Sequence, residues 1–128
     1  MSKLGCPCGN TIRDNTSGLP YKASLLKDSL RESFSDWLVQ EIQSYVAAVE
    51  CGGVREWLMG RGYGEEYIAL QLDHGNVLHD HIQTRYLCLK RDVYECPACG
   101  RIHVETREDN AFVMYAPDSR KSNGALSE

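Results

Sequence analysis

Residues 96–100 read Cys-Pro-Ala-Cys-Gly, and residues 6–9 read Cys-Pro-Cys-Gly. Each stretch places two thiols in a tight turn that ends in glycine, which accepts the positive φ that such turns require. Four thiolates are a common ligand set for tetrahedral zinc, and two such turns would supply them. The sequence therefore predicts one structural zinc ion, with all four coordination positions filled, bound by Cys6, Cys8, Cys96 and Cys99.

The two pairs differ in spacing, which leaves alternatives open. The first pair has one residue between its thiols instead of two, so it would bind zinc with distorted angles, and the sequence does not decide whether it supplies both ligands. Cys96 and Cys99 could also form a redox pair, but that function needs a helix N-terminus after the first thiol, and a glycine and a strand-like segment follow instead. Cys51 and Cys88 have no second cysteine at ligand spacing, and we expect both to be buried thiols.

Strand-like segments flank the cysteine pairs. Residues 102–105 alternate in polarity, and the turn-forming residues 108–110 then lead into the apolar residues 111–115, which predicts a β-hairpin directly after the second pair. A short strand is expected over residues 11–13, and another from Leu87 towards Cys96. Residues 118–128 offer almost nothing to bury, so they are predicted to be disordered.

The middle of the chain is helical in pattern. Between residues 30 and 49, apolar side chains recur at the spacing of one helix face: Leu30, Phe34, Trp37, Leu38, Ile42, Tyr45, Val46 and Val49. Ser29 with Glu32 predicts a capping box at the start, and Gly52–Gly53 predicts the end. Shorter helices are expected over residues 54–59, 65–72 and 76–86, the last one capped by Asn76. Residues 60–64, which are rich in glycine, are expected to be an interhelical loop.

These elements predict an α+β fold. A small zinc-ribbon-like antiparallel sheet would carry a helical insertion, at about residues 27–86, between the two cysteine knuckles. The metal would connect the beginning of the chain to its end, so residues 1–117 are expected to form one zinc-stapled domain.

The cysteine pattern resembles the zinc-ribbon group, and more loosely small bacterial proteins that begin with a short cysteine knuckle and end with C-P-x-C-G before a hairpin. The resemblance covers the two ends of the chain. It implies a three-stranded, metal-stapled sheet with Cys6, Cys8, Cys96 and Cys99 in the ligand positions. It implies no particular function, because zinc ribbons serve in transcription, translation, enzymes and protein contacts.

Composition narrows the class of protein. The 128 residues are 42% hydrophobic and 25% charged, with 14 basic and 18 acidic residues and a net charge of −4. Such a charge disfavours nucleic acid as a partner. No apolar run reaches the roughly 18 residues of a membrane span, and the first residues do not read as a signal peptide, so a soluble, cytoplasmic protein without a membrane partner is expected. Familiar catalytic motifs are missing, and we expect no enzyme.

The predicted long helix suggests a binding function. Its acidic residues lie off the apolar face, and such a surface suits a basic protein partner. These residues are Glu32, Asp36, Glu41 and Glu50. The leading hypothesis is a non-catalytic, zinc-binding protein-interaction module, such as an immunity protein or inhibitor that neutralises a basic toxin or enzyme by direct binding.

Two other functions stay open. A zinc ribbon that binds nucleic acid would use a basic patch with aromatic faces, for which the candidates are Arg85, Lys90, Arg91, Arg101 and Arg107 with Tyr86 and Tyr94. A metal-dependent hydrolase would use a cluster of His74, His79 and His81 with Asp73 and Asp80. In a helix, however, His79 and His81 would lie on different faces, which disfavours a shared metal.

Overall fold

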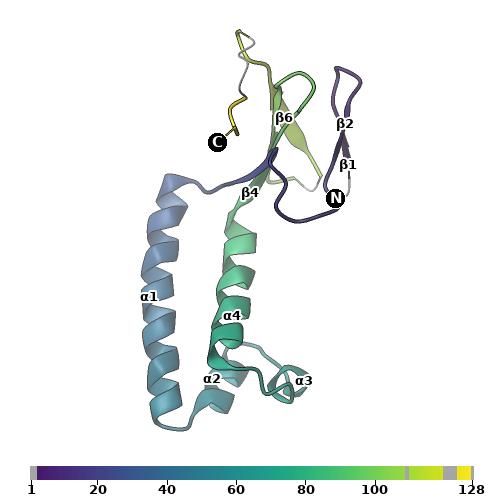
Figure 1. Cartoon of the computed structure of the whole chain (residues 1–128). Helices are drawn as coiled ribbons and strands as arrows, with labels where there is room; N and C mark the ends of the chain where they lie inside the picture. The colour runs from purple at the N-terminus through teal and green to yellow at the C-terminus, as the bar shows by residue number, and fades with distance from the viewer. Residues whose placement is uncertain (1–2, 109, 120–123, 128) are drawn as a thin grey trace. The chain divides into compact units, whose positions relative to one another are not determined.

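The computed structural model describes residues 3–108, 110–119 and 124–127, and within them it confirms an α+β fold with two small antiparallel sheets and four helices (Figure 1). The strands are β1 (Lys3–Gly5), β2 (Thr11–Arg13), β3 (Lys22–Leu25), β4 (Arg91–Glu95), β5 (Ile102–Glu105) and β6 (Phe112–Tyr115). The helices are α1 (Asp28–Glu50), α2 (Val54–Gly60), α3 (Glu65–Ile68) and α4 (His74–Leu89). None of these helices is both long and apolar enough to cross a membrane.

The chain divides by its contacts into two compact units. The β unit comprises Met1–Leu26 and Lys90–Glu128, and the helical unit comprises Lys27–Leu89. The helical unit is therefore inserted between β3 and β4, two strands that pair with each other. That residues 1–117 form one domain, in which the two units unfold together, stays a prediction.

The sheets of the β unit hold more strands than the expected three. β1 pairs with β2, and a separate sheet has the order β3-β4-β5-β6, with every pair antiparallel. The predicted hairpin of β5 and β6 is confirmed, with Val104 opposite Val113. β3 is a strand that the sequence pattern did not predict. Its partner strand, β4, is distant in sequence, and Leu25 lies opposite Arg91 in their register.

A small core joins the two sheets of the β unit. Its buried members are Cys6, Ile12, Tyr94 and Cys96, so strand residues and predicted metal ligands share one core. The hydroxyl of Tyr94 donates a hydrogen bond to the Asp14 carboxylate, which also pairs with Lys22 at 2.7 Å. These bonds connect the segment after β2 to β3 and β4. The tail predicted to be disordered includes residues 120–123 and 128, which lie outside the described residues.

The start of α1 differs from the prediction, whereas its end agrees. The helix begins at Asp28 after an extended Lys27, and no side chain caps it, so the predicted capping box of Ser29 and Glu32 is wrong. Asp28 suits the first turn because its charge faces the positive end of the helix dipole, and it pairs with Arg31 one turn later. Gly52 ends the helix with a φ of 73°, which glycine adopts without strain.

The shorter helices also differ in extent from the expected ones. α3 ends at Ile68, four residues before the predicted end. α4 begins at His74, and the side chain of Asp73 accepts a hydrogen bond from the Asn76 N–H at 2.8 Å, so Asp73 caps the helix instead of Asn76. α4 continues to Leu89, and the strand predicted from Leu87 starts only at Arg91.

Figure 1 shows α1 and α4 side by side within the helical unit, with α2 and α3 gathered near one end of the pair. The buried core of the unit lies on α1, α2 and α4 and consists of Tyr45, Ala48, Trp57, Leu58 and Val77. The residues predicted as one apolar face of α1 do not all point to this core. Ile42, Val46 and Val49 are exposed, as is Val39.

Candidate functional site

The four predicted ligands lie together in the β unit. Their sulfur atoms all lie within 4.8 Å of one another, although Cys6 and Cys8 are separated by most of the chain from Cys96 and Cys99. Two sulfur–sulfur distances join the knuckles, Cys6 to Cys99 and Cys8 to Cys96, and both are 3.6 Å. The edge of a tetrahedron with metal–sulfur bonds of about 2.3 Å is about 3.8 Å long. The cluster is therefore spaced to hold a metal ion.

The two knuckles are related turns of different length. In the first, the Gly9 N–H donates to the carbonyl of Cys6 at 2.9 Å, and Gly9 has a φ of 98°. In the second, the Gly100 N–H donates to the carbonyl of Cys96 at 2.8 Å, and Gly100 has a φ of 78°. The second turn is longer by the one residue that separates the motifs. Both positive φ values explain why glycine follows each cysteine pair.

Polar groups around the second knuckle favour the thiolate form of its cysteines. Burial acts to raise the pKa of Cys99, but the backbone and side-chain hydrogen bonds of Arg101 outweigh it and lower the pKa to about 6. Burial likewise opposes ionisation of Cys96, yet N–H groups within the turn and the amide of Asn10, 3.5 Å from the sulfur, lower its pKa overall. The thiolate form of Cys99, which is the metal-binding form, is thus favoured near neutral pH, and the thiolate of Cys96 forms more readily than that of an ordinary cysteine.

In the first knuckle, by contrast, the surroundings of Cys6 favour the protonated thiol. Burial, with the neighbouring sulfur of Cys99 adding to it, raises the pKa of Cys6 to about 12. A metal ion bound by all four sulfurs would displace the proton from Cys6, so binding is coupled to proton release. Cys8, by contrast, is exposed.

The two remaining cysteines are not buried, contrary to expectation. Cys51 and Cys88 are both exposed free thiols. Cys88 was expected to lie in a strand, on the side opposite Leu87 and Leu89, but α4 extends through this position and the side chain is exposed. Since neither belongs to the sulfur cluster, the pair provides a matched control for substitutions of the ligands.

The structure does not bring the three histidines together. His74 Nδ1 lies 2.7 Å from the hydroxyl of Tyr45, whereas His81 contacts Tyr63 and Glu41. His79 is exposed beside Asp80. Among the described residues, the four cysteines are the one group of His, Cys, Asp or Glu side chains spaced to hold a metal ion.

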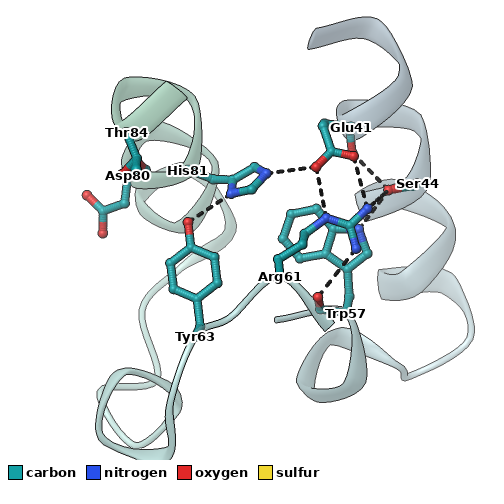
Figure 2. A network of polar contacts seen from close by, with 8 residues as sticks. All are labelled: Glu41, Ser44, Trp57, Arg61, Tyr63, Asp80, His81 and Thr84. Atoms are coloured by element: carbon teal, nitrogen blue, oxygen red, sulfur yellow. Dashed lines mark hydrogen bonds and ion pairs between the residues drawn. The ribbon is translucent and has the colours of Figure 1, made fainter. Parts of the chain in front are cut away.

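A second polar cluster lies in the helical unit and is centred on Glu41 of α1 (Figure 2). The guanidinium of Arg61 donates two hydrogen bonds of 2.9 Å to the two carboxylate oxygens, and it stacks on Trp57 with its carbon 3.9 Å from the ring centroid. His81 of α4 donates from Nε2 to Glu41 at 2.9 Å, because a carboxylate only accepts. In the neutral ring, Nδ1 then accepts from the hydroxyl of Tyr63 at 2.8 Å.

We call this cluster the Glu41 network. It corrects the prediction that Glu41 lies on an acidic outer surface, and it shows what the loop after α2 contributes to the helical unit. Glu41 was assigned to an acidic outer surface, but its side chain is only 16% exposed and is paired. The interhelical loop expected over residues 60–64 covers residues 61–64, because Gly60 still belongs to α2, and Arg61 and Tyr63 in this loop bind the helices to each other. A signal was present in the sequence, because Glu41 lies four residues before Tyr45 on the buried face of α1.

The Glu41 network predicts that the helical unit loses stability in acid. Hydrogen bonds from Arg61, against the opposing effect of burial and with help from His81, lower the pKa of Glu41 from 4.5 to about 2. Because the folded-state pKa is depressed, this stabilisation is complete above about pH 5 and disappears as the pH falls through 4.5 towards 2. Urea unfolding followed by tryptophan fluorescence between these pH values will measure it. In the Glu41→Gln variant the free energy of unfolding should depend visibly less on pH. An unchanged pH dependence would contradict its assignment to Glu41.

The chain belongs to the family described as a domain of unknown function, DUF8617, whose profile matches residues 2–119. Both cysteine pairs and the entire helical unit lie inside the matched range. Neither the curated proteins nor the solved structures contain a significant match to this chain.

Proposed function

We propose that the protein is a non-catalytic, zinc-binding protein-interaction module. The observation that supports the metal is the pair of 3.6 Å sulfur–sulfur distances between the two knuckles, which match the edges of a zinc–thiolate tetrahedron. Four sulfur ligands fill the coordination shell, so the ion stabilises the β unit and leaves no position for a substrate or an activated water.

The chemistry of the donors favours zinc over the hard divalent ions. Magnesium and calcium bind through oxygen, whereas tetrahedral sites with four sulfurs select zinc or iron. Asn10 and Arg101 add hydrogen bonds to the sulfurs of Cys96 and Cys99, which disperse the charge of the thiolates. The proposed site thus has both its ligands and its supporting donors.

The partner that we propose is a basic protein, for instance a toxin or an enzyme that the module neutralises in the cytoplasm. Glu32, Asp36 and Glu50 remain exposed on α1 and supply the acidic surface, whereas Glu41 is committed to the Glu41 network. Such a surface would act mainly on the rate and specificity of association, because exposed charge pairs contribute little affinity.

Three of the side chains that a nucleic-acid-binding ribbon would need are engaged in contacts within the protein. Tyr94 is buried and bonded to Asp14, so it presents no stacking face. Lys90 pairs with Asp92, and Arg101 lies against Cys99. These contacts favour a protein partner over a nucleic acid.

Native mass spectrometry of the protein purified gently from its host tests the metal and the partner together. We expect one zinc ion per chain and a stoichiometric basic protein. Simultaneous Glu32→Lys, Asp36→Lys and Glu50→Lys should release that protein while the zinc remains, because these residues lie outside the β unit. A folded chain without metal would overturn the zinc proposal. Iron in place of zinc would identify the other metal that four thiolates bind. A partner that stays bound after charge reversal would exclude the acidic surface as its binding site.

A further inference from the structure

We propose that α1 is the interface of an antiparallel homodimer of this protein. The contact surface is a line of apolar side chains, Val39, Ile42, Val46 and Val49, which we call the α1 stripe. These four side chains are 54, 36, 47 and 37% exposed, although each is large and apolar. The inference goes beyond the proposed function and does not depend on the metal site.

The spacing of the α1 stripe is that of a helix–helix seam. Its members follow one another at intervals of three, four and three residues, as the a and d positions of a heptad do. All four are β-branched, and such side chains lose little rotamer freedom when they pack between helices. The stripe lies on a different side of α1 from Phe34, Leu38, Tyr45 and Ala48, which belong to the less exposed face.

Charge points to a second copy as the occupant. Between Trp37 and Val49 the sequence holds one charged residue, Glu41, and that side chain is paired with Arg61. The exposed side of α1 is therefore uncharged over more than three turns, in a chain with 25% charged residues. An uncharged apolar surface is complemented by another of the same kind, and a second copy of α1 supplies one.

The order of the residues fits a twofold axis. With two α1 helices antiparallel and the axis near residue 44, Val39 of one copy lies opposite Val49 of the other, and Ile42 lies opposite Val46. A parallel pair would instead bring Glu32 beside Glu32 and Glu50 beside Glu50 at its edges. Antiparallel packing separates these like charges and opposes the helix dipoles, so it is favoured.

The architecture of the helical unit is consistent with this assembly. α1 and α4 form a two-helix layer, as Figure 1 shows, and the buried residues on α1 are Tyr45 and Ala48, in its second half. Two such layers joined through α1 make a four-helix arrangement, in which the α1 stripe becomes the interior. The monomer leaves that surface in water.

Sedimentation equilibrium across about 1 μM to 1 mM protein tests the dimer. We expect a concentration-dependent dimer, and Val46→Glu should raise the dissociation constant at least about 100-fold, because it buries an unpaired charge. The matched control is Leu87→Glu on α4, where the side chain is 58% exposed and off the stripe. Circular dichroism of each variant verifies the fold. A wild-type chain that stays monomeric throughout, or an equal effect of Leu87→Glu, would overturn the proposal.

Charge exchange tests the direction of the two helices. Val39→Glu and Val49→Glu should each raise the dissociation constant of the dimer. The double variant Val39→Lys, Val49→Glu should have a dissociation constant at least about tenfold lower than either single variant, since each lysine then faces a glutamate. The double variant Val39→Glu, Val49→Glu, which is the matched control, should recover none of the lost affinity between the two copies. Equal weakness of the two double variants would refute the antiparallel register. Zinc content should be the same in all of them, so failure here is distinguishable from failure of the metal proposal.

Discussion

Simultaneous replacement of Cys96 and Cys99 by serine is expected to abolish metal binding and to unfold the β unit. Two of the four sulfurs that gather between the knuckles would be lost, and the binding free energy of a structural zinc ion is part of the folding free energy. The small core of the β unit includes Cys6 and Cys96 themselves, so little else holds the two sheets together. Hydrogen exchange should show loss of protection in β4 and β5.

The helical unit provides an internal reference for this experiment. Both tryptophans of the chain, Trp37 and Trp57, lie in the helical unit, so their fluorescence reports its folding separately. The control variant carries Cys51→Ser and Cys88→Ser, which removes two exposed thiols outside the cluster. It should retain one metal ion and full protection. Unchanged metal content in the Cys96→Ser, Cys99→Ser variant would refute the four-cysteine site.

Replacement of Glu41 by alanine is expected to have the second large effect, a loss of about 3–5 kcal/mol in the free energy of unfolding of the helical unit. The guanidinium of Arg61 and the ring of His81 would lose their shared acceptor, and both lie in a half-buried site between α1 and α4. Leaving a desolvated charge without its partner costs more than the pair contributes. Urea unfolding followed by tryptophan fluorescence measures the change directly, because Trp57 stacks on Arg61.

Two variants on the same helix make this result specific. Glu50 is exposed and has no bond in the Glu41 network, so Glu50→Ala should change the stability by less than about 0.5 kcal/mol. Glu41→Gln keeps an acceptor oxygen for one of the donors and should fall between the two. If Glu41→Ala behaved like Glu50→Ala, the network would be a surface contact without energetic weight.

The cysteine cluster could be predicted from the sequence because its signal is local. Each thiol pair carries its own turn and its own glycine, so the ligands can be recognised without knowing how the distant ends meet. The β5–β6 hairpin and the helix ends at Gly52 were predictable for the same reason, since a turn or a glycine decides them within a few residues.

Elements that depend on distant partners could not be predicted. β3 alternates polar and apolar residues over only four positions, which is too short a pattern to predict a strand, and its partner β4 is separated from it in sequence by the whole helical unit. Leu87 and Leu89 alternate as in a strand, but α4 continues through both. In the Glu41 network, Glu41, Arg61 and His81 lie on three separate segments, and only the packed unit shows that they meet.

The insertion of the helical unit between β3 and β4 also determines the order in which the chain can fold during synthesis. The helical unit consists of residues 27–89, so the contacts within it can form while the second knuckle has not yet been made. At about 5–20 residues per second, Cys6 and Cys8 leave the ribosome several seconds before Cys96 and Cys99. During that interval the first two thiols lack their partners. The second knuckle can therefore join the first only after the helical unit has had time to form.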